Sequence, residues 1–234
     1  MTLNAKAQRA FEKDTVAATR TAVKGSGWRV SKGVLFRQEG DWFFAVHRRR
    51  LSPDLTDGFT VELMGKPMAL DPLYWEVMGL EDNASQPLSF RYWGAFVCGS
   101  PMLASETIAA SDPETTAAEM VASASRMLPR AKKRLATEIF SEIAANNAGT
   151  DGQWRMAETV LHARRLEGDE VGAAALARDK PSTVSVSSLF DDPLRAGRDH
   201  NAIFLAMKDQ TTAPTGDRPE ADEKRGFWAR LFGR

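Results

Sequence analysis

The chain has 234 residues, of which 43% are hydrophobic and 26% are charged. This composition is ordinary for a soluble globular protein, and it excludes collagen-like, mucin-like and wholly disordered chains. The single cysteine, Cys98, excludes an intramolecular disulfide and any zinc or iron–sulfur cluster built from several cysteines. The length allows one large domain or two small ones.

The charges balance overall, with 31 basic and 31 acidic residues, but they are unevenly distributed. Residues 1–50 contain eleven Lys and Arg against four Asp and Glu, whereas residues 51–125 contain two against eleven. We expect these two regions to neutralise each other within one fold, because elements of one domain usually share a surface.

Neither a secretory signal nor a membrane-spanning segment is expected. Residues 1–6 lack the apolar core of a signal peptide, and the longest interior apolar run, residues 94–99, is far shorter than the roughly 20 residues that span a bilayer. The sequence therefore predicts a cytoplasmic protein whose lone thiol stays reduced.

The first half of the chain predicts one helix followed by strands. The helix covers residues 3–23, and the strands cover residues 28–36 with a bend at Gly33, then 42–47, 59–64 and 89–97. The short turn at 39–41 makes the first two strands an antiparallel hairpin. Residues 71–88 are expected to be irregular. Five aromatic residues are the expected core: Trp28, Phe43, Phe59, Phe90 and Phe96.

The second half of the chain is alanine-rich and predicts helices. These cover residues 113–127 and 130–146, separated or kinked at Pro129, then a helical hairpin of 153–166 and 169–178, and a last helix at 199–208. Asp112 is the expected N-cap of the first of them. The fold class is α+β, with a sheet of about four antiparallel strands. We expect a sheet domain at 1–110, a helical region at 111–210 packed on it, a linker at 211–219 and a tail at 220–234.

No catalytic motif is found. The chain has no glycine-rich phosphate loop, no His-Glu-x-x-His and no Gly-x-Ser-x-Gly. His47, His162 and His200 lack acidic or histidine neighbours at metal-ligand spacing, apart from Asp199 adjacent to His200, which is a poor geometry for a shared metal. Cys98 is expected to be a buried, inert thiol. We therefore expect no catalytic residue, no cofactor and no metal.

The densest basic run, His47-Arg48-Arg49-Arg50, ends the second strand and is a candidate contact for an anionic partner. Alternate strand residues face opposite sides of a sheet, so at most half of these side chains share a face. No helix-turn-helix or zinc finger accompanies them, and nucleic acid is not the expected partner.

The strand segments carry a loose resemblance. The segments 27–30, 34–37, 42–46 and 59–63 are similar to a broad family of uncharacterised bacterial α+β domains, over about residues 8–100. That family has no established activity, so the resemblance implies no functional residue. It implies an α+β domain that binds a partner.

The tail carries the strongest local signal. As a helix, residues 224–233 place Phe227, Trp228, Leu231 and Phe232 on one face, bordered by Lys224, Arg225 and Arg230. Large apolar side chains beside cations are typical of a helix lying in a membrane interface. This segment resembles the C-terminal membrane-targeting helix of the septum-positioning ATPase MinD, without the ATPase itself. The alternative is a helix docked in the domain's own groove or on a partner.

The sequence thus predicts a non-enzymatic cytoplasmic binding protein with a protein partner. Its tail either tethers it to the anionic inner face of the membrane or docks on protein. Two other hypotheses stay open: an enzyme of unrecognised type with a cleft on the aromatic sheet, and a binder of anionic partners through the basic N-terminal region.

Overall fold

The computed structural model describes residues 5–51, 58–94, 96–133, 154–179 and 200–212. The chain divides into two compact units. The sheet unit comprises residues 1–69, 86–95 and 99–143, and the helical unit comprises residues 70–85, 96–98 and 144–234. The sheet unit therefore extends past the boundary expected at residue 110, because the helix at Pro113–Lys132 packs on the sheet.

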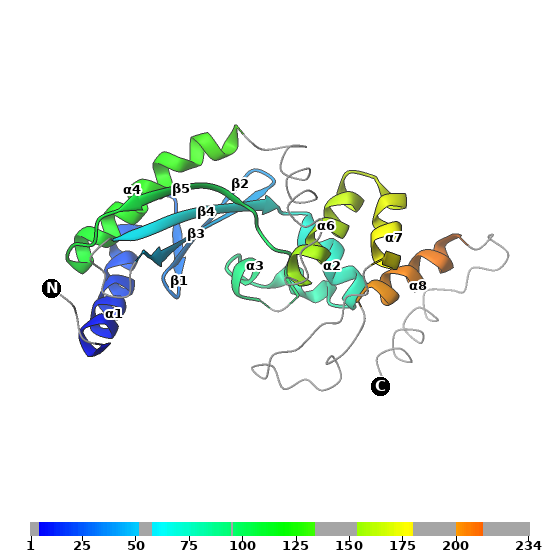
Figure 1. Ribbon diagram of the computed structural model, residues 1–234, viewed down its shortest axis with the longest axis horizontal. Helices are drawn as coiled ribbons and strands as arrows, with labels where there is room; N and C mark the ends of the chain where they lie inside the picture. The colour runs from blue at the N-terminus through cyan, green and yellow to red at the C-terminus, as the bar shows by residue number, and fades with distance from the viewer. Residues whose placement is uncertain (1–4, 52–57, 95, 134–153, 180–199, 213–234) are drawn as a thin grey trace. The chain divides into compact units, whose positions relative to one another are not determined.

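Among its described residues, the sheet unit contains five antiparallel strands in the order β1-β2-β3-β4-β5, together with three helices (Figure 1). The strands are β1 (Arg29–Ser31), β2 (Val34–Glu39), β3 (Trp42–Arg50), β4 (Phe59–Pro67) and β5 (Met102–Ile108). The helices are α1 (Ala5–Ala22), the short α3 (Phe90–Trp93) and α4 (Pro113–Lys132). The predicted α+β class is confirmed, with five strands where about four were expected.

Two tight turns set the register of the first three strands. Lys32 and Gly33 have φ angles of 50° and 81°, so they form a two-residue turn of the kind that matches strand twist. This turn separates β1 from β2, where we expected one strand with a bend. The second turn lies at Gly40 and Asp41, as predicted, and pairs Glu39 with Trp42.

Two expectations for residues 71–97 are wrong. The predicted strand 89–97 is instead α3 followed by irregular backbone, and the fifth strand is Met102–Ile108. Alternation alone does not determine which segment pairs with β4, and β4 pairs with residues 102–108 instead. The segment expected to be irregular contains α2 (Leu70–Met78), whose buried Leu70, Tyr74 and Trp75 follow helical spacing.

The helix α4 begins as predicted and runs through Pro129 without dividing. The side chain of Asp112 accepts a hydrogen bond from the Thr115 amide at 2.9 Å, and Pro113 occupies the first turn. Pro129 lies in the last turn of the helix, which continues to Lys132. The remainder of the predicted helix 130–146 lies outside the described residues.

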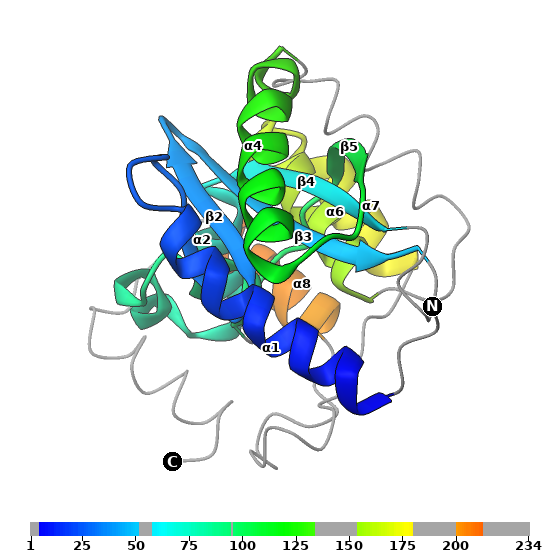
Figure 2. The same cartoon turned by 90° about the vertical axis from the view of Figure 1, so that its left-hand side faces the viewer.

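One face of the sheet is covered by α1 and α4, which lie across the strands in Figure 2. The rings of Phe11 in α1 and Phe59 in β4 stack with their centroids 6.0 Å apart. Met120 and Met127 of α4 are fully buried. The other face carries a smaller cluster of Val34, Phe36, Phe43 and Ala45, against which Met64, Met68, Leu88 and Tyr92 pack.

Four of the five predicted core aromatics are buried. Trp28, Phe43 and Phe59 are buried in the sheet unit and Phe96 in the helical unit. Phe90 is only half-buried, because α3 rather than a central strand carries it.

The helical unit contains α2, the 3₁₀ helix η1 (Glu81–Ser85), α6 (Trp154–Leu166), α7 (Glu170–Asp179) and α8 (His200–Thr212). The predicted hairpin of α6 and α7 is present and turns at Gly168, whose φ is 82°. The indole of Trp75 is buried and donates to the carbonyl oxygen of Phe96 at 2.7 Å. None of the helices in the described part of the chain is long and apolar enough to cross a bilayer.

Candidate binding surface on the sheet

Strand alternation divides the basic run at the end of β3 between the two faces of the sheet. Arg48 and Arg50 lie on the face covered by α1, where both pair with Glu12. The guanidinium of Arg48 also lies over the ring of Phe59, with its carbon 5.0 Å from the ring centroid. The side chain of Arg48 is only 8% exposed. These two arginines therefore join α1 to the sheet.

His47 and Arg49 lie on the opposite face, where both contact Glu62 of β4. The Nε2 atom of His47 is 2.9 Å from one carboxylate oxygen. Arg49 donates to the other oxygen from Nε at 3.1 Å and from Nη2 at 2.9 Å. The register of β3 and β4 places His47 directly opposite Glu62. Of the four residues predicted to contact an anionic partner, His47 and Arg49 lie on this face.

Tyr92 of α3 completes the cluster. Its hydroxyl lies 3.3 Å from Nδ1 of His47. With neutral His47, Nε2–H donates to Glu62 and Nδ1 accepts from Tyr92, whereas a protonated ring donates from both nitrogens. The arrangement can therefore persist in either charge state of the imidazole. We call Tyr92, His47, Glu62 and Arg49 the polar array.

The order carboxylate, imidazole, hydroxyl is the one that activates hydroxyl nucleophiles in hydrolases. One feature of the polar array differs from that use: Arg49 neutralises the carboxylate that would stabilise a charged imidazole. The contacts of Glu62 with His47 and Arg49, and the 3.3 Å contact of Tyr92 with His47, hold the four side chains together.

Exposed apolar side chains flank the polar array. Met102 of β5 is 54% exposed and lies opposite Met64 in the register. Trp93 of α3 is 41% exposed, and its ring meets that of Tyr92 edge to face with centroids 4.8 Å apart. The Trp93 indole donates to the Ser31 carbonyl at 3.3 Å, which fixes the orientation of the ring.

Together these residues form a surface that we call the open face. It consists of the polar array, the two exposed apolar residues, Met64, and the hydroxyl residues of β4 and β5 on the same side: Thr60, Ser105 and Thr107. Sequence reasoning found only His47 and Arg49 of this set.

The other two histidines are buried in the helical unit. Nε2 of His162 in α6 lies 3.1 Å from Nε2 of His200 in α8, and both side chains are fully buried. Nδ1 of His200 lies 3.0 Å from Oδ1 of Asn201, and Nη1 of Arg165 lies 3.4 Å from Nδ1 of His162. Burial, the neighbouring His200 and the cation of Arg165 hold the pKa of His162 well below its usual value.

These contacts define one pattern of donors. Arg165 donates to His162, His162 Nε2–H donates to His200, and His200 Nδ1–H donates to the Asn201 amide oxygen. Both rings are then neutral and every ring nitrogen is used. The pair joins α6 to α8 and offers no access to a ligand.

Cys98 is buried, as predicted. Its Sγ lies 3.7 Å from the Leu70 carbonyl oxygen, and its amide donates to the Asp71 carboxylate at 2.8 Å. Within the described ranges, no group of three or more His, Cys, Asp or Glu could hold a metal ion. The predicted tail contacts, residues 224–232, lie outside the described residues.

Comparison with known proteins identifies no relative. No family model, no curated protein and no solved structure matches the chain.

Proposed function

We propose that this protein is a non-enzymatic binding protein whose protein partner docks on the open face of the sheet. The observation that carries the proposal is the polar array flanked by exposed Trp93 and Met102. Tryptophan, tyrosine and arginine are the residue types that most often dominate the binding energy of interfaces. Methionine adapts its shape to a partner at low cost.

The contacts within the open face favour binding because they hold its side chains in position before a partner arrives. Arg49 is fixed by two hydrogen bonds to Glu62, and Trp93 by its bond to Ser31. A side chain that is already ordered loses less conformational entropy on association.

The array also indicates the chemistry of the partner. Glu62 contacts Arg49 through Nε and Nη2, and the Arg49 side chain is 67% exposed, so its guanidinium retains N–H donors that a partner's carboxylate can reach. The ammonium of Lys32 lies 5.5 Å from the Trp93 ring centroid. We expect the partner to present an apolar group to Met102 and Trp93 and a carboxylate to Arg49.

The tail supports a second part of the proposal, that the protein acts in the cytoplasm at the inner face of the membrane. Four large apolar residues on one face, at about 1.5–3 kcal/mol each when buried, exceed the cost of nucleating a short helix. Binding is expected to be weak and strongest on anionic vesicles. Co-sedimentation of wild type but not of Phe227→Glu/Leu231→Glu is the expected result, and equal sedimentation of both would refute the tether.

The partner interface is tested by affinity capture with matched variants. Trp93→Glu/Met102→Glu places two charges on the open face, whereas Ala118→Glu places one on an exposed position of α4. We expect wild type and Ala118→Glu to retain the same specific protein and the double variant to lose it. Equal retention by all three forms would exclude the open face as the interface.

A further inference from the structure

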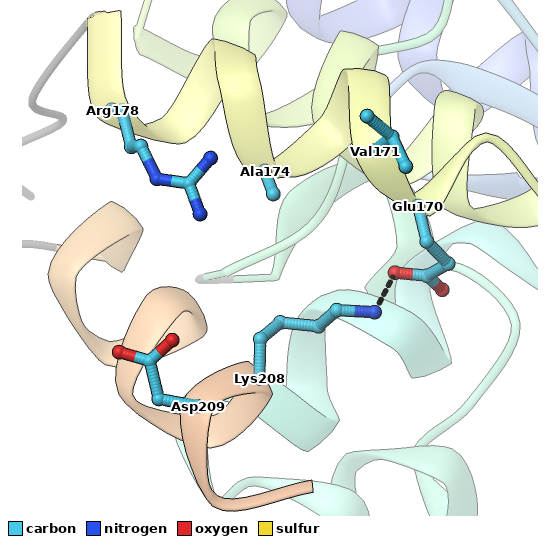
Figure 3. A pocket seen from close by; sticks show the side chains of 6 residues that line it. All are labelled: Glu170, Val171, Ala174, Arg178, Lys208 and Asp209. Carbon is cyan, nitrogen blue, oxygen red and sulfur yellow. Dashed lines mark hydrogen bonds and ion pairs between the residues drawn. The ribbon is translucent and has the colours of Figure 1, made fainter. Parts of the chain in front are cut away.

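We infer that the C-terminal segment, residues 220–234, docks its apolar face into the groove between α7 and α8 of its own helical unit. The groove is a hollow of about 320 Å³ lined by Glu170, Val171, Ala174, Arg178, Lys208 and Asp209 (Figure 3). This volume is at the lower end of the range for ligand pockets, about 300–1,000 Å³. It suits one large side chain, such as that of Trp228, rather than a whole cofactor.

The lining of the groove is apolar in its middle and charged at both ends. Val171 is 83% exposed, and no other large apolar side chain in the described part of the chain is more exposed. Because the side chain of Ala174 is only a methyl group, space remains between α7 and α8 at this position. At one end Lys208 Nζ and Glu170 form an ion pair at 2.6 Å, drawn as a dashed line in Figure 3.

The charges at the other end correspond to the order of charges in the tail. Arg178 of α7 and Asp209 of α8 lie there (Figure 3). The tail begins with Glu220, Asp222 and Glu223 and continues with its basic residues, among them Lys224 and Arg225. An acidic segment followed at once by a basic one is complementary in charge to the two sides of this end.

The described chain ends close to the groove. Thr212 ends α8 three residues after Asp209, which is about 4.5 Å along the helix axis. The seven residues 213–219 can then span about 23 Å when extended. That reach allows the tail to turn back, and a short tether gives it an effective concentration of the order of millimolar at the groove.

Docking would bury the four apolar residues of the tail in the groove. These are the same residues that a membrane or a partner would bind. The inference does not rest on membrane binding, because it concerns contacts within one chain in solution. It does predict competition: one apolar face cannot be buried in the groove and in a second surface at once.

The test is hydrogen exchange of the full chain in solution, compared among four forms. Phe227→Glu/Leu231→Glu alters the tail, Val171→Glu alters the groove, and Ala175→Glu alters an exposed α7 position that does not line the groove. We expect amides 224–233 to exchange about tenfold more slowly than unprotected amides in wild type and in Ala175→Glu, as for a docked-to-open ratio of about ten. In Val171→Glu this protection should be lost, and in the tail variant the α7 amides should exchange faster.

Unprotected tail amides in wild type, or equal tail protection in Val171→Glu and Ala175→Glu, would overturn the inference. Because Val171 is so exposed, its replacement is not expected to unfold the unit, and unchanged exchange at buried Trp75 checks this. Vesicle binding is the separate measurement. If the tail also binds membranes, Val171→Glu should bind anionic vesicles up to about tenfold more tightly. If no form binds vesicles, the proposed membrane tether is refuted, but the docking inference is not affected.

Discussion

In the sheet unit, His47 lies half-buried between the Glu62 carboxylate and the Tyr92 hydroxyl, whereas in the helical unit His162 and His200 contact each other and are fully buried. In the first setting each ring nitrogen faces a polar group near the surface. In the second, a proton added to either ring would put two donors face to face in a medium that does not solvate charge. Histidine therefore forms part of a surface site in the sheet unit, whereas in the helical unit it joins two helices through buried hydrogen bonds.

The arginines show the same difference within a single strand. Arg48 and Arg49 are adjacent in β3, yet the first is nearly buried against α1 and the second is two-thirds exposed. A run of like charges in sequence is thus divided into one structural residue and one residue suited to partner contact.

The largest expected effect concerns the core beneath α1. Phe59→Ala should lower the free energy of unfolding by about 3–5 kcal/mol, because Phe59 is fully buried and stacks on Phe11. Phe90→Ala is the matched control, since its half-buried ring should cost clearly less. Urea denaturation measures both. Equal losses in the two variants would contradict the assignment of Phe59 to a strand and Phe90 to a peripheral helix.

The second prediction concerns pH and the buried side chain of His162. Because the pKa of folded His162 lies well below 6.5, the unfolded chain binds more protons below pH 6.5, and stability falls as the pH decreases. The expected loss for the helical unit is up to about 1.4 kcal/mol per pH unit, beginning near pH 6.5 and continuing down to the folded pKa. Above pH 6.5 the contribution of His162 should not change.

Hydrogen exchange of the α6 amides between pH 5 and 7.5, corrected for the intrinsic rate, measures this loss. His162→Gln should reduce the slope. An unchanged slope in His162→Gln would contradict the assignment.

The third prediction compares the two neighbouring arginines. Arg48→Ala should cost about 1.5–3 kcal/mol of stability, the range for hydrogen bonds to charged groups, because it leaves Glu12 without this partner beside Phe59. Arg49→Ala should cost less than about 1 kcal/mol, as expected for an exposed pair. Thermal unfolding of both variants at low and high salt measures the difference. A reversed order of stability would refute the division of roles.

Much of the fold could be predicted because its signals are local. The turn at Gly40, the cap at Asp112 and the helical hairpin around Gly168 depend on a few neighbouring residues. The strand predicted at 89–97 failed because aromatic alternation does not say which segment β4 will pair with. That choice depends on contacts between residues far apart in the sequence, here β4 and β5.

The open face was beyond sequence reasoning for the same reason. His47 and Glu62 are fifteen positions apart and meet only because Arg50 pairs with Phe59 in the β3–β4 register. That register was the one available signal: continuing it from the strand ends would have placed His47 opposite Glu62. Tyr92 could not have been added, since it lies on a helix where a strand was expected.

The central claim is that the open face binds a protein partner, and site-specific photo-crosslinking in cells tests it most directly. A photoreactive phenylalanine analogue is placed at exposed Met102, and at exposed Ala118 on the covered side of the sheet as control. We predict one discrete crosslinked adduct from position 102 that is absent from position 118 and that is lost when Trp93→Glu is added. Adducts of equal yield from both positions, or an adduct from position 118 alone, would contradict the claim.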